Sequence, residues 1–242
     1  MNKRFWEIDF FRGISIILMI IFNYSFALSY LNIYTLNDGF FYWYVFPRLI
    51  ASMFIFIAGL SLTLMHHQIK KSREIYKKFF LRGLKIFGCG VLITAITYLT
   101  FPEAFIIFGI LHFIGISIIL GSFFLKFKKL NLLLGLLIII SGFFLQNFRF
   151  DFSWLLWLGF IPRNFYTFDY FPILPWFGVT LLGLFFGNLL YKDGKRRFKI
   201  KDISDVSVVR FLSFLGRKSL TIYLFHQPLL ILLLLILGFK IF

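Results

Sequence analysis

Long uncharged apolar runs, separated by short basic or polar segments, dominate the pattern of this chain. A membrane-spanning helix needs about 17 to 25 mostly apolar residues, because it rises about 1.5 Å per residue across about 30 Å of hydrocarbon. Seven runs in the sequence have roughly that length. We predict spans at about 13–31, 44–65, 79–99, 105–125, 130–146, 172–191 and 214–239.

These runs are typical of helices rather than of barrel strands. Only helices and closed barrels pair all their backbone polar groups inside a bilayer, and barrel strands are shorter and alternate in polarity. Segment 152–162 is apolar but too short to span, and Pro162 closes it. We therefore predict an all-α, polytopic transmembrane helical bundle of about seven spans plus a short interfacial or re-entrant segment, forming a single domain over residues 1–242.

Composition agrees with a membrane protein. Hydrophobic residues make up 60% of the chain and charged residues only 15%, with a mean hydropathy of +0.88. A soluble domain of this size cannot bury that much apolar surface. The first run is too long for a signal peptide and lacks a cleavage site, so we expect it to remain as a helix. The single cysteine, Cys89, excludes an intrachain disulfide.

The net charge of +16 would suggest nucleic acid binding in a soluble chain. The basic residues fall between the apolar runs, however, and no nucleic-acid module accompanies them, so we predict no nucleic acid partner. With a cytoplasmic N-terminus, 22 of the 26 Lys and Arg residues lie on the inner side. This bias follows the positive-inside rule. We predict a cell-membrane protein with the N-terminus inside and the C-terminus outside.

Three polar residues interrupt the apolar runs near mid-membrane or in its outer half. They are Asn23, His112 and His226. Polar groups in a bilayer are costly and often mark a functional site, although they also form ordinary hydrogen bonds between helices. Three at similar depth favour a shared polar cavity.

Charged residues at the ends of the runs offer further candidates. Asp9 and Arg12 are three residues apart, which places them on one helical face, and the spacing alone favours an anchoring ion pair at the headgroups. Asp169 precedes the run 172–191, where it can cap the helix, hold a histidine or bind a polar acceptor. Asp38 belongs to a sparse acidic outer rim. The sequence has no HExxH or GxSxG motif and no Cys–His pair, and we predict no metal.

Five segments, in order, resemble the heparan-alpha-glucosaminide N-acetyltransferase catalytic-domain family, in particular its prokaryotic relatives. They are "IDFFRGISIILMIIFNY" (8–24), "FIFIAGLSL" (54–62), "FGILHFIGIS" (108–117), "DYFPILPWFG" (169–178) and "LGRKSLTIYLFHQPLL" (215–230). The resemblance covers nearly the whole chain. It implies a transmembrane acyltransferase that takes an acetyl group from cytosolic acetyl-CoA to an amine or hydroxyl of a glycan or glycolipid on the other side.

The resemblance also suggests roles for single residues. Asn23 matches the asparagine of the lysosomal enzyme's "NY", which lines the reaction channel. Many prokaryotic relatives carry histidine there, with aspartate four residues later, whereas this chain has Asn23 and Ala27. The catalytic histidine of the lysosomal enzyme lies after the first helix, and loop 32–43 contains none.

Acyl transfer from a thioester needs a base and a stabilised oxyanion. His112 and His226 are the only candidates within the spans that titrate near neutral pH. We favour His226, because Pro228 frees the carbonyl of residue 224 to orient its ring, and assign Asn23 as oxyanion donor or acyl positioner. Arg12 and Lys85, with Asp9 beside Arg12, are assigned to the phosphates of the nucleotide. Asp169 and Asp38 are assigned to the acceptor.

Two other functions remain open at this stage. A channel or carrier for a small polar solute needs the same midplane polar residues. A non-catalytic relative that binds a lipid or a partner would explain the missing His–Asp pair. A homodimer is also left open.

The charge distribution gives a direct test of topology. In a Cys89→Ser background, we expect Lys195→Cys to resist a membrane-impermeant thiol reagent added to intact cells and to react after lysis. Reaction in intact cells would place this connection outside and contradict the proposed orientation.

Overall fold

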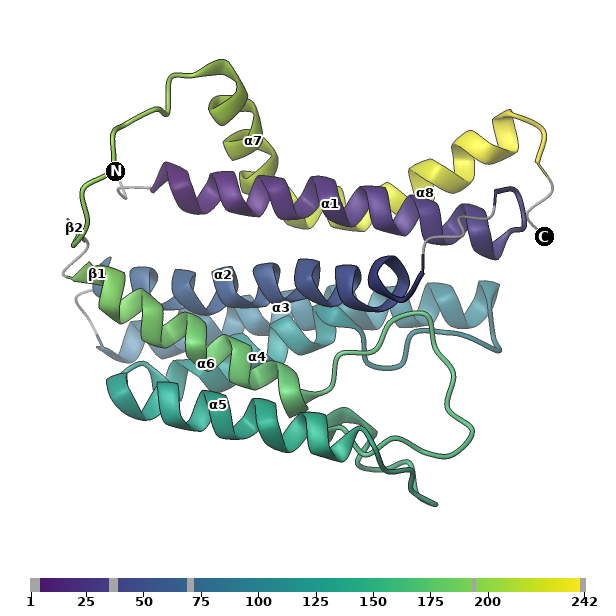
Figure 1. Cartoon of the computed structure of the whole chain (residues 1–242), viewed down its shortest axis with the longest axis horizontal. Helices are drawn as coiled ribbons and strands as arrows, with labels where there is room; N and C mark the ends of the chain where they lie inside the picture. The colour runs from purple at the N-terminus through teal and green to yellow at the C-terminus, as the bar shows by residue number, and fades with distance from the viewer. Residues whose placement is uncertain (1–4, 35–38, 69–71, 193–194, 240–242) are drawn as a thin grey trace. The chain divides into compact units, whose positions relative to one another are not determined.

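The structure, a computed structural model, describes residues 5–34, 39–68, 72–192 and 195–239. Asp38 lies outside the described residues. Helices dominate the chain (Figure 1). The helices are α1 (Trp6–Tyr30), η1 (Phe41–Val45), α2 (Phe46–Gln68), α3 (Ser72–Thr100), α4 (Ile110–Phe124), α5 (Lys128–Leu145), η2 (Leu156–Leu158), α6 (Ile173–Leu190), α7 (Ser207–Arg217) and α8 (Ser219–Ile236). The short strands β1 (Tyr191–Lys192) and β2 (Lys195–Arg196) pair antiparallel.

The prediction of an all-α, polytopic membrane bundle is confirmed. Each of the seven predicted runs contains a helix, and six of these are long and apolar enough to cross a bilayer. The seventh, α4, is apolar but has only 15 residues. Segment 152–162 contains only the single 3₁₀ turn η2, as expected for a segment that does not span.

Two predicted boundaries are wrong. The fourth helix begins at Ile110 and not near residue 105, because residues 101–109 form an irregular connection that hydrogen-bonds to residues 167–171. The last run is divided at Lys218 into α7 and α8. Hydropathy alone joined the last turn of α7 to α8, because Phe214 and Leu215 near the end of α7 are apolar.

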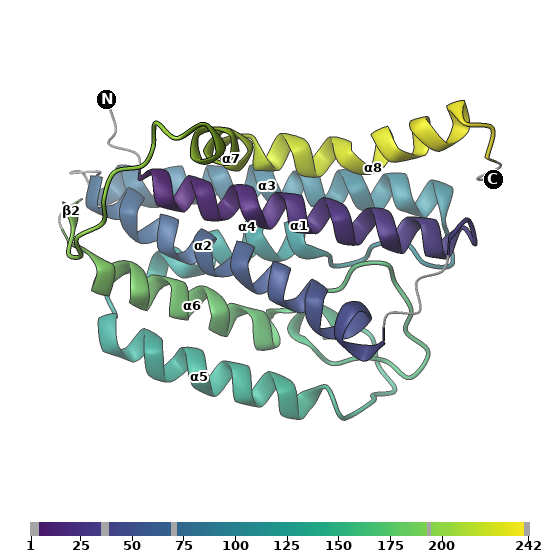
Figure 2. The same cartoon turned by 45° about the horizontal axis from the view of Figure 1, so that its top comes forward.

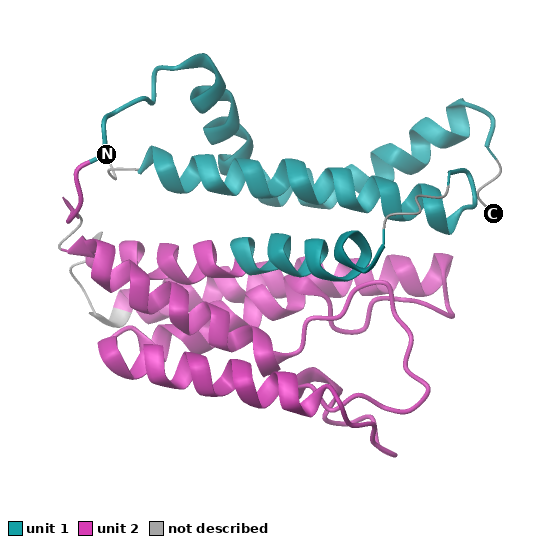
Figure 3. Cartoon of the chain, in the orientation of Figure 1, with its two compact units in different colours: residues 1, 3–54, 200–242 teal, residues 2, 55–199 magenta. Residues whose placement is uncertain are grey.

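The chain forms two compact units (Figure 3). Unit 1 contains residues 3–54 and 200–242, and unit 2 contains residues 55–199. Unit 1 therefore joins the two ends of the chain, with α1, the start of α2, α7 and α8. Unit 2 contains the rest of α2 and α3 to α6.

In unit 1, α1 and α8 lie side by side and run in the same direction (Figures 1 and 2). A first and a last span that run parallel need an odd number of crossings between the two ends of the chain. Six long apolar helices give an even number, and α4, with 15 residues, is the remaining apolar helix that could supply a seventh crossing. α8 contains Pro228. The C-terminal part of α8 diverges from α1 in Figure 1.

Glycines allow α7 to approach α1 closely at the end where α1 begins. A Cβ on Gly13 would meet the carbonyl oxygen of Leu212, and one on Gly216 would meet the carbonyl oxygen of Asp9. Glycine is therefore required on both helices, since the backbones are in contact. Further along, Ile16, Met19 and Ile50 form the buried core of unit 1.

In unit 2, contacts follow the order α5, α6, α4, α3. Small residues again set the distances: a Cβ on Gly135 of α5 would lie 3.0 Å from the carbonyl oxygen of Gly178 in α6. A Cβ on Gly115 of α4 would lie 2.7 Å from the backbone nitrogen of Phe87 in α3. Close backbone approach through small residues is a usual mode of helix association in membranes.

The contact between α7 and α1 predicts a large effect from a small substitution. We expect Gly216→Ala to lower the free energy of unfolding by about 1–3 kcal/mol, because the added methyl group has no space against α1. Gly88→Ala in α3 is the control, since nothing lies within 4 Å of the added Cβ and alanine favours a helix. Thermal unfolding in detergent measures both. Equal stability of Gly216→Ala and the wild type would contradict the close packing.

Candidate active site

Asn23 and His226 meet within unit 1. The Nδ2 atom of Asn23 lies 3.1 Å from Nε2 of His226, although 203 residues separate them in sequence. Asn23 lies in the second half of α1, and His226 is the eighth residue of α8. His226 is only 5% exposed. The pairing gives the asparagine of the first apolar run a polar partner on the neighbouring helix.

The other ring nitrogen fixes the tautomer of His226. Nδ1 lies 2.6 Å from the carbonyl oxygen of Tyr223, which can only accept a hydrogen bond. In the neutral ring, Nδ1 therefore carries the proton and donates it to Tyr223, and Nε2 accepts from the Asn23 amide. The sequence had suggested the carbonyl of residue 224 for this role. The structure corrects this to Tyr223, one residue earlier.

Tyr24 is a third member of the site that sequence reasoning missed. Its hydroxyl donates to the carbonyl oxygen of His226 at 3.0 Å, and its ring stacks on the imidazole with centroids 6.4 Å apart. Adjacent residues of α1 thus hold both the ring and the backbone of His226. Residues 23–24 carry the "NY" of the family resemblance, but nothing in the sequence shows that Tyr24 reaches residue 226.

His112 has a different environment, in unit 2. Its Nδ1 accepts from the backbone N–H of Gly109 at 3.3 Å, and Nε2 lies 3.3 Å from the hydroxyl of Thr94. The Thr94 hydroxyl donates its proton to the carbonyl oxygen of Ile106. It therefore accepts a hydrogen bond from the N–H at Nε2 of His112. Phe87 packs edge-on against the imidazole and Phe108 stacks on it. Both nitrogens of His112 are occupied in holding the first turn of α4.

The three polar residues of the apolar runs belong to two different units. The structure brings Asn23 and His226 together, whereas His112 belongs to the other unit and has its own partners. Because α4 begins at Ile110, His112 is the third residue of its helix rather than one in its middle. Thr94, its partner on α3, gave no signal in the sequence.

Asp169 caps a helix, but the helix is α4 and not α6. Its Oδ2 accepts from the backbone N–H of Ile110 at 2.9 Å, and a Cβ on Gly109 would fall against the carboxylate. The residue lies in the connection before α6, outside the spanning helices. Burial raises the pKa of the Asp169 carboxyl to about 6, although the hydrogen bond from Ile110 acts in the opposite direction.

The candidates at the inner rim are separated between the units. Arg12 donates to Asp9 at 3.0 Å, which confirms the ion pair predicted from their spacing. Asp9 is buried, whereas Lys85 is exposed on α3 in unit 2. Among the described residues, no group of three His, Cys, Asp or Glu side chains is arranged to hold a metal ion.

Comparison with known protein families agrees with the sequence segments quoted above. The family model described as heparan-alpha-glucosaminide N-acetyltransferase, catalytic, matches residues 4–228. The chain belongs to this family. The match includes Asn23, Tyr24 and His226, the three residues that meet in unit 1. No curated protein and no solved structure matches the chain.

The elevated pKa of Asp169 predicts a pH dependence of stability. A carboxyl whose pKa rises from 3.8 to about 6 on folding favours the folded state when protonated, so stability falls as pH rises between these values. The loss is at most about 3 kcal/mol, and less because the side chain keeps some contact with solvent.

We expect Asp169→Asn to remove this dependence, because the amide stays neutral and its oxygen can still accept from Ile110. Thermal unfolding in detergent from pH 4 to pH 7 compares the two proteins. The same pH profile in both would show that Asp169 does not titrate in this range.

Proposed function

We propose that this protein is a membrane-embedded acyltransferase that moves an acetyl group from cytosolic acetyl-CoA to an amine or hydroxyl of a glycan or glycolipid acceptor. Membership of the acetyltransferase family supports the reaction class. The hydrogen bond between His226 Nδ1 and the Tyr223 carbonyl is the observation that carries the proposal. It leaves Nε2 unprotonated, as a general base requires.

The proton and the electron pairs can be followed through the transfer. When an acceptor binds, its N–H or O–H replaces the Asn23 amide as the donor to His226 Nε2. Nε2 takes that proton as the acceptor atom attacks the thioester carbonyl carbon and forms the new bond. The tetrahedral adduct then expels the CoA thiolate, which takes the proton from His226. The base is regenerated for the next cycle.

Asn23 contributes to this reaction through its amide N–H groups. Once displaced from Nε2, the amide can donate to the carbonyl oxygen of the thioester, where negative charge develops. Tyr24 holds the backbone of His226 and stacks on its ring, so it acts as a positioning residue. An amide and an imidazole that exchange partners in this way need no metal.

The donor and the acceptor are assigned to opposite sides of the membrane. Arg12 and Lys85 are proposed to bind the phosphates of acetyl-CoA from the cytoplasmic side, with Asp9 orienting the Arg12 guanidinium. Asp169 and Asp38 are proposed to contact the acceptor at the outer end. A non-catalytic relative is the alternative, favoured by Ala27 in place of the aspartate of many relatives.

The function is tested by incubating the purified protein with labelled acetyl-CoA and a panel of amino sugars and glycolipids. Transfer of label to any member of the panel supports an acyltransferase. Binding of CoA without transfer to any acceptor would favour the non-catalytic relative.

The two histidines give a matched pair of variants. We expect His226→Gln to lower turnover by about 10²–10⁴-fold with little loss of thermal stability, because it removes the base. His112→Gln should mainly lower stability, because it disrupts the first turn of α4. Turnover and thermal unfolding of both variants separate the two roles. A fully active His226→Gln would contradict the assignment of the base.

A further inference from the structure

One face of α7 packs against α1, and the rest is exposed. Its buried residues, Val209, Ser213 and Gly216, recur at intervals of four and three, as expected for one face of a helix. On the exposed side, Phe211 and Phe214 are 59% and 49% accessible. Because they are three residues apart, these two aromatic side chains form an apolar strip on the exposed side of α7.

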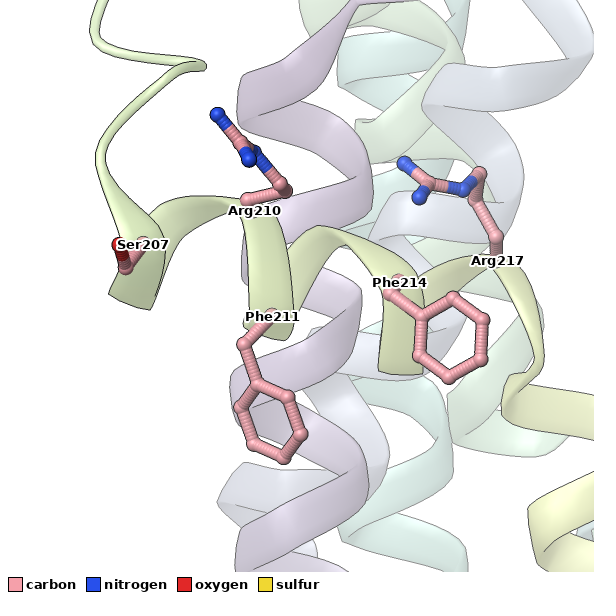
Figure 4. Close-up of a pocket in the computed structure, with 5 residues that line it drawn as sticks. All are labelled: Ser207, Arg210, Phe211, Phe214 and Arg217. Atoms are coloured by element: carbon pink, nitrogen blue, oxygen red, sulfur yellow. The ribbon is translucent and has the colours of Figure 1, made fainter.

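Basic residues lie along the same exposed side. Arg210 and Arg217 line a shallow hollow of about 420 Å³ together with Ser207 and the two phenylalanines. In Figure 4 the guanidinium groups point to one edge of α7 and the phenylalanine rings to the opposite edge. α8 leaves α7 on the edge to which the rings point (Figure 4). The helix is thus divided into a basic edge and an apolar edge.

The position of α7 relative to the membrane follows from chain connectivity. Only Lys218 separates the end of α7 from Ser219, the first residue of the candidate span α8. α7 also packs against the first turns of α1, another candidate span. Both contacts hold α7 at the depth where two spans begin, which is the boundary between hydrocarbon and water. At that boundary, an apolar edge suits the hydrocarbon side and a basic edge suits the water and headgroup side.

We propose that α7 is an interfacial helix that binds anionic phospholipids of the cytoplasmic leaflet. Phe211 and Phe214 enter the boundary between headgroups and acyl chains, and Arg210 and Arg217 contact lipid phosphates. This arrangement is that of an amphipathic helix lying in a membrane surface, with apolar residues below and basic residues at headgroup level. The inference does not depend on the proposed acyltransferase activity.

The other charges around α7 are compatible with an anionic surface. Arg210 lies 3.8 Å from the Asp205 carboxylate and donates to the Asp205 backbone carbonyl at 3.1 Å. Both side chains are largely exposed, so the ion pair is weak and can exchange for a phosphate. Asp202 accepts from the backbone N–H of Ser204 in the preceding turn. Lys201 and Lys218 add positive charge at the two ends. Residues 192–218 contain nine basic and three acidic residues, which gives the segment a clear positive balance.

The first experiment measures depth in the membrane. Spin labels are attached to the full-length protein, in a Cys89→Ser background, through Phe211→Cys, Phe214→Cys, Arg217→Cys and Lys201→Cys. In vesicles that contain phosphatidylglycerol, we expect labels at 211 and 214 to collide more with oxygen than with a water-soluble nickel chelate. Labels at 217 and 201 should show the reverse.

Access of nickel to positions 211 and 214 as high as at 201 would overturn the proposal. Protection of 211 and 214 from both oxygen and nickel would also overturn it, because another part of the chain or a second copy would then cover α7.

The second experiment measures lipid selectivity. We expect Arg217→Gln to weaken the apparent affinity for phosphatidylglycerol, relative to phosphatidylcholine, about fivefold, which corresponds to about 1 kcal/mol for a basic residue at an anionic surface. Lys129→Gln, an exposed basic residue at the start of α5, is the matched control and should change the ratio less than Arg217→Gln. Lipid retention by the purified protein gives the ratio. Equal ratios in the two variants would contradict binding at α7.

Discussion

The hydrogen bond between Asn23 and His226 joins α1 and α8, two apolar helices of unit 1. A bilayer supplies no water, so an amide and an imidazole within apolar helices have to find each other or remain unpaired at considerable cost. The bond requires α1 and α8 to lie in contact and in register. Because Tyr223 and Tyr24 take up the other polar atoms of His226, its Nε2 is left as the only atom that can exchange partners. The proposed chemistry depends on this exchange of hydrogen-bond partners at Nε2.

Close backbone contacts make this register compatible with the rest of unit 1. Gly13 and Gly216 let α7 touch α1 at the end where α8 begins, which fixes the start of α8 against α1. From there, seven residues of helix, about 10 Å of rise, lead to His226. In the proposed interfacial arrangement, the same contact holds the exposed edges of α7 at the membrane boundary. Packing by small residues thus serves both the candidate active site and the proposed lipid-binding helix.

The apolar runs predicted the helical bundle correctly, because the length of a span is set by the thickness of the bilayer. They did not predict the start of α4 or the break at Lys218, since these depend on hydrogen bonds and backbone contacts with distant residues. Asn23 and His226 were recognisable as costly polar residues. Their pairing, the tautomer and the part played by Tyr24 were not, because no local pattern relates positions about 200 residues apart. Asp169 illustrates the same limit, as it caps a helix that precedes it by 59 residues.

The tautomer of His226 is the most direct test of this account. The chain has four histidines, so ¹⁵N labelling of histidine gives few signals, and the His226→Gln variant identifies the one that belongs to residue 226. At neutral pH we expect ¹⁵N chemical shifts of a neutral ring with the proton on Nδ1, and the opposite tautomer for His112. A proton on Nε2 of His226, or a doubly protonated ring, would leave no lone pair toward Asn23 and would contradict the assignment of His226 as base.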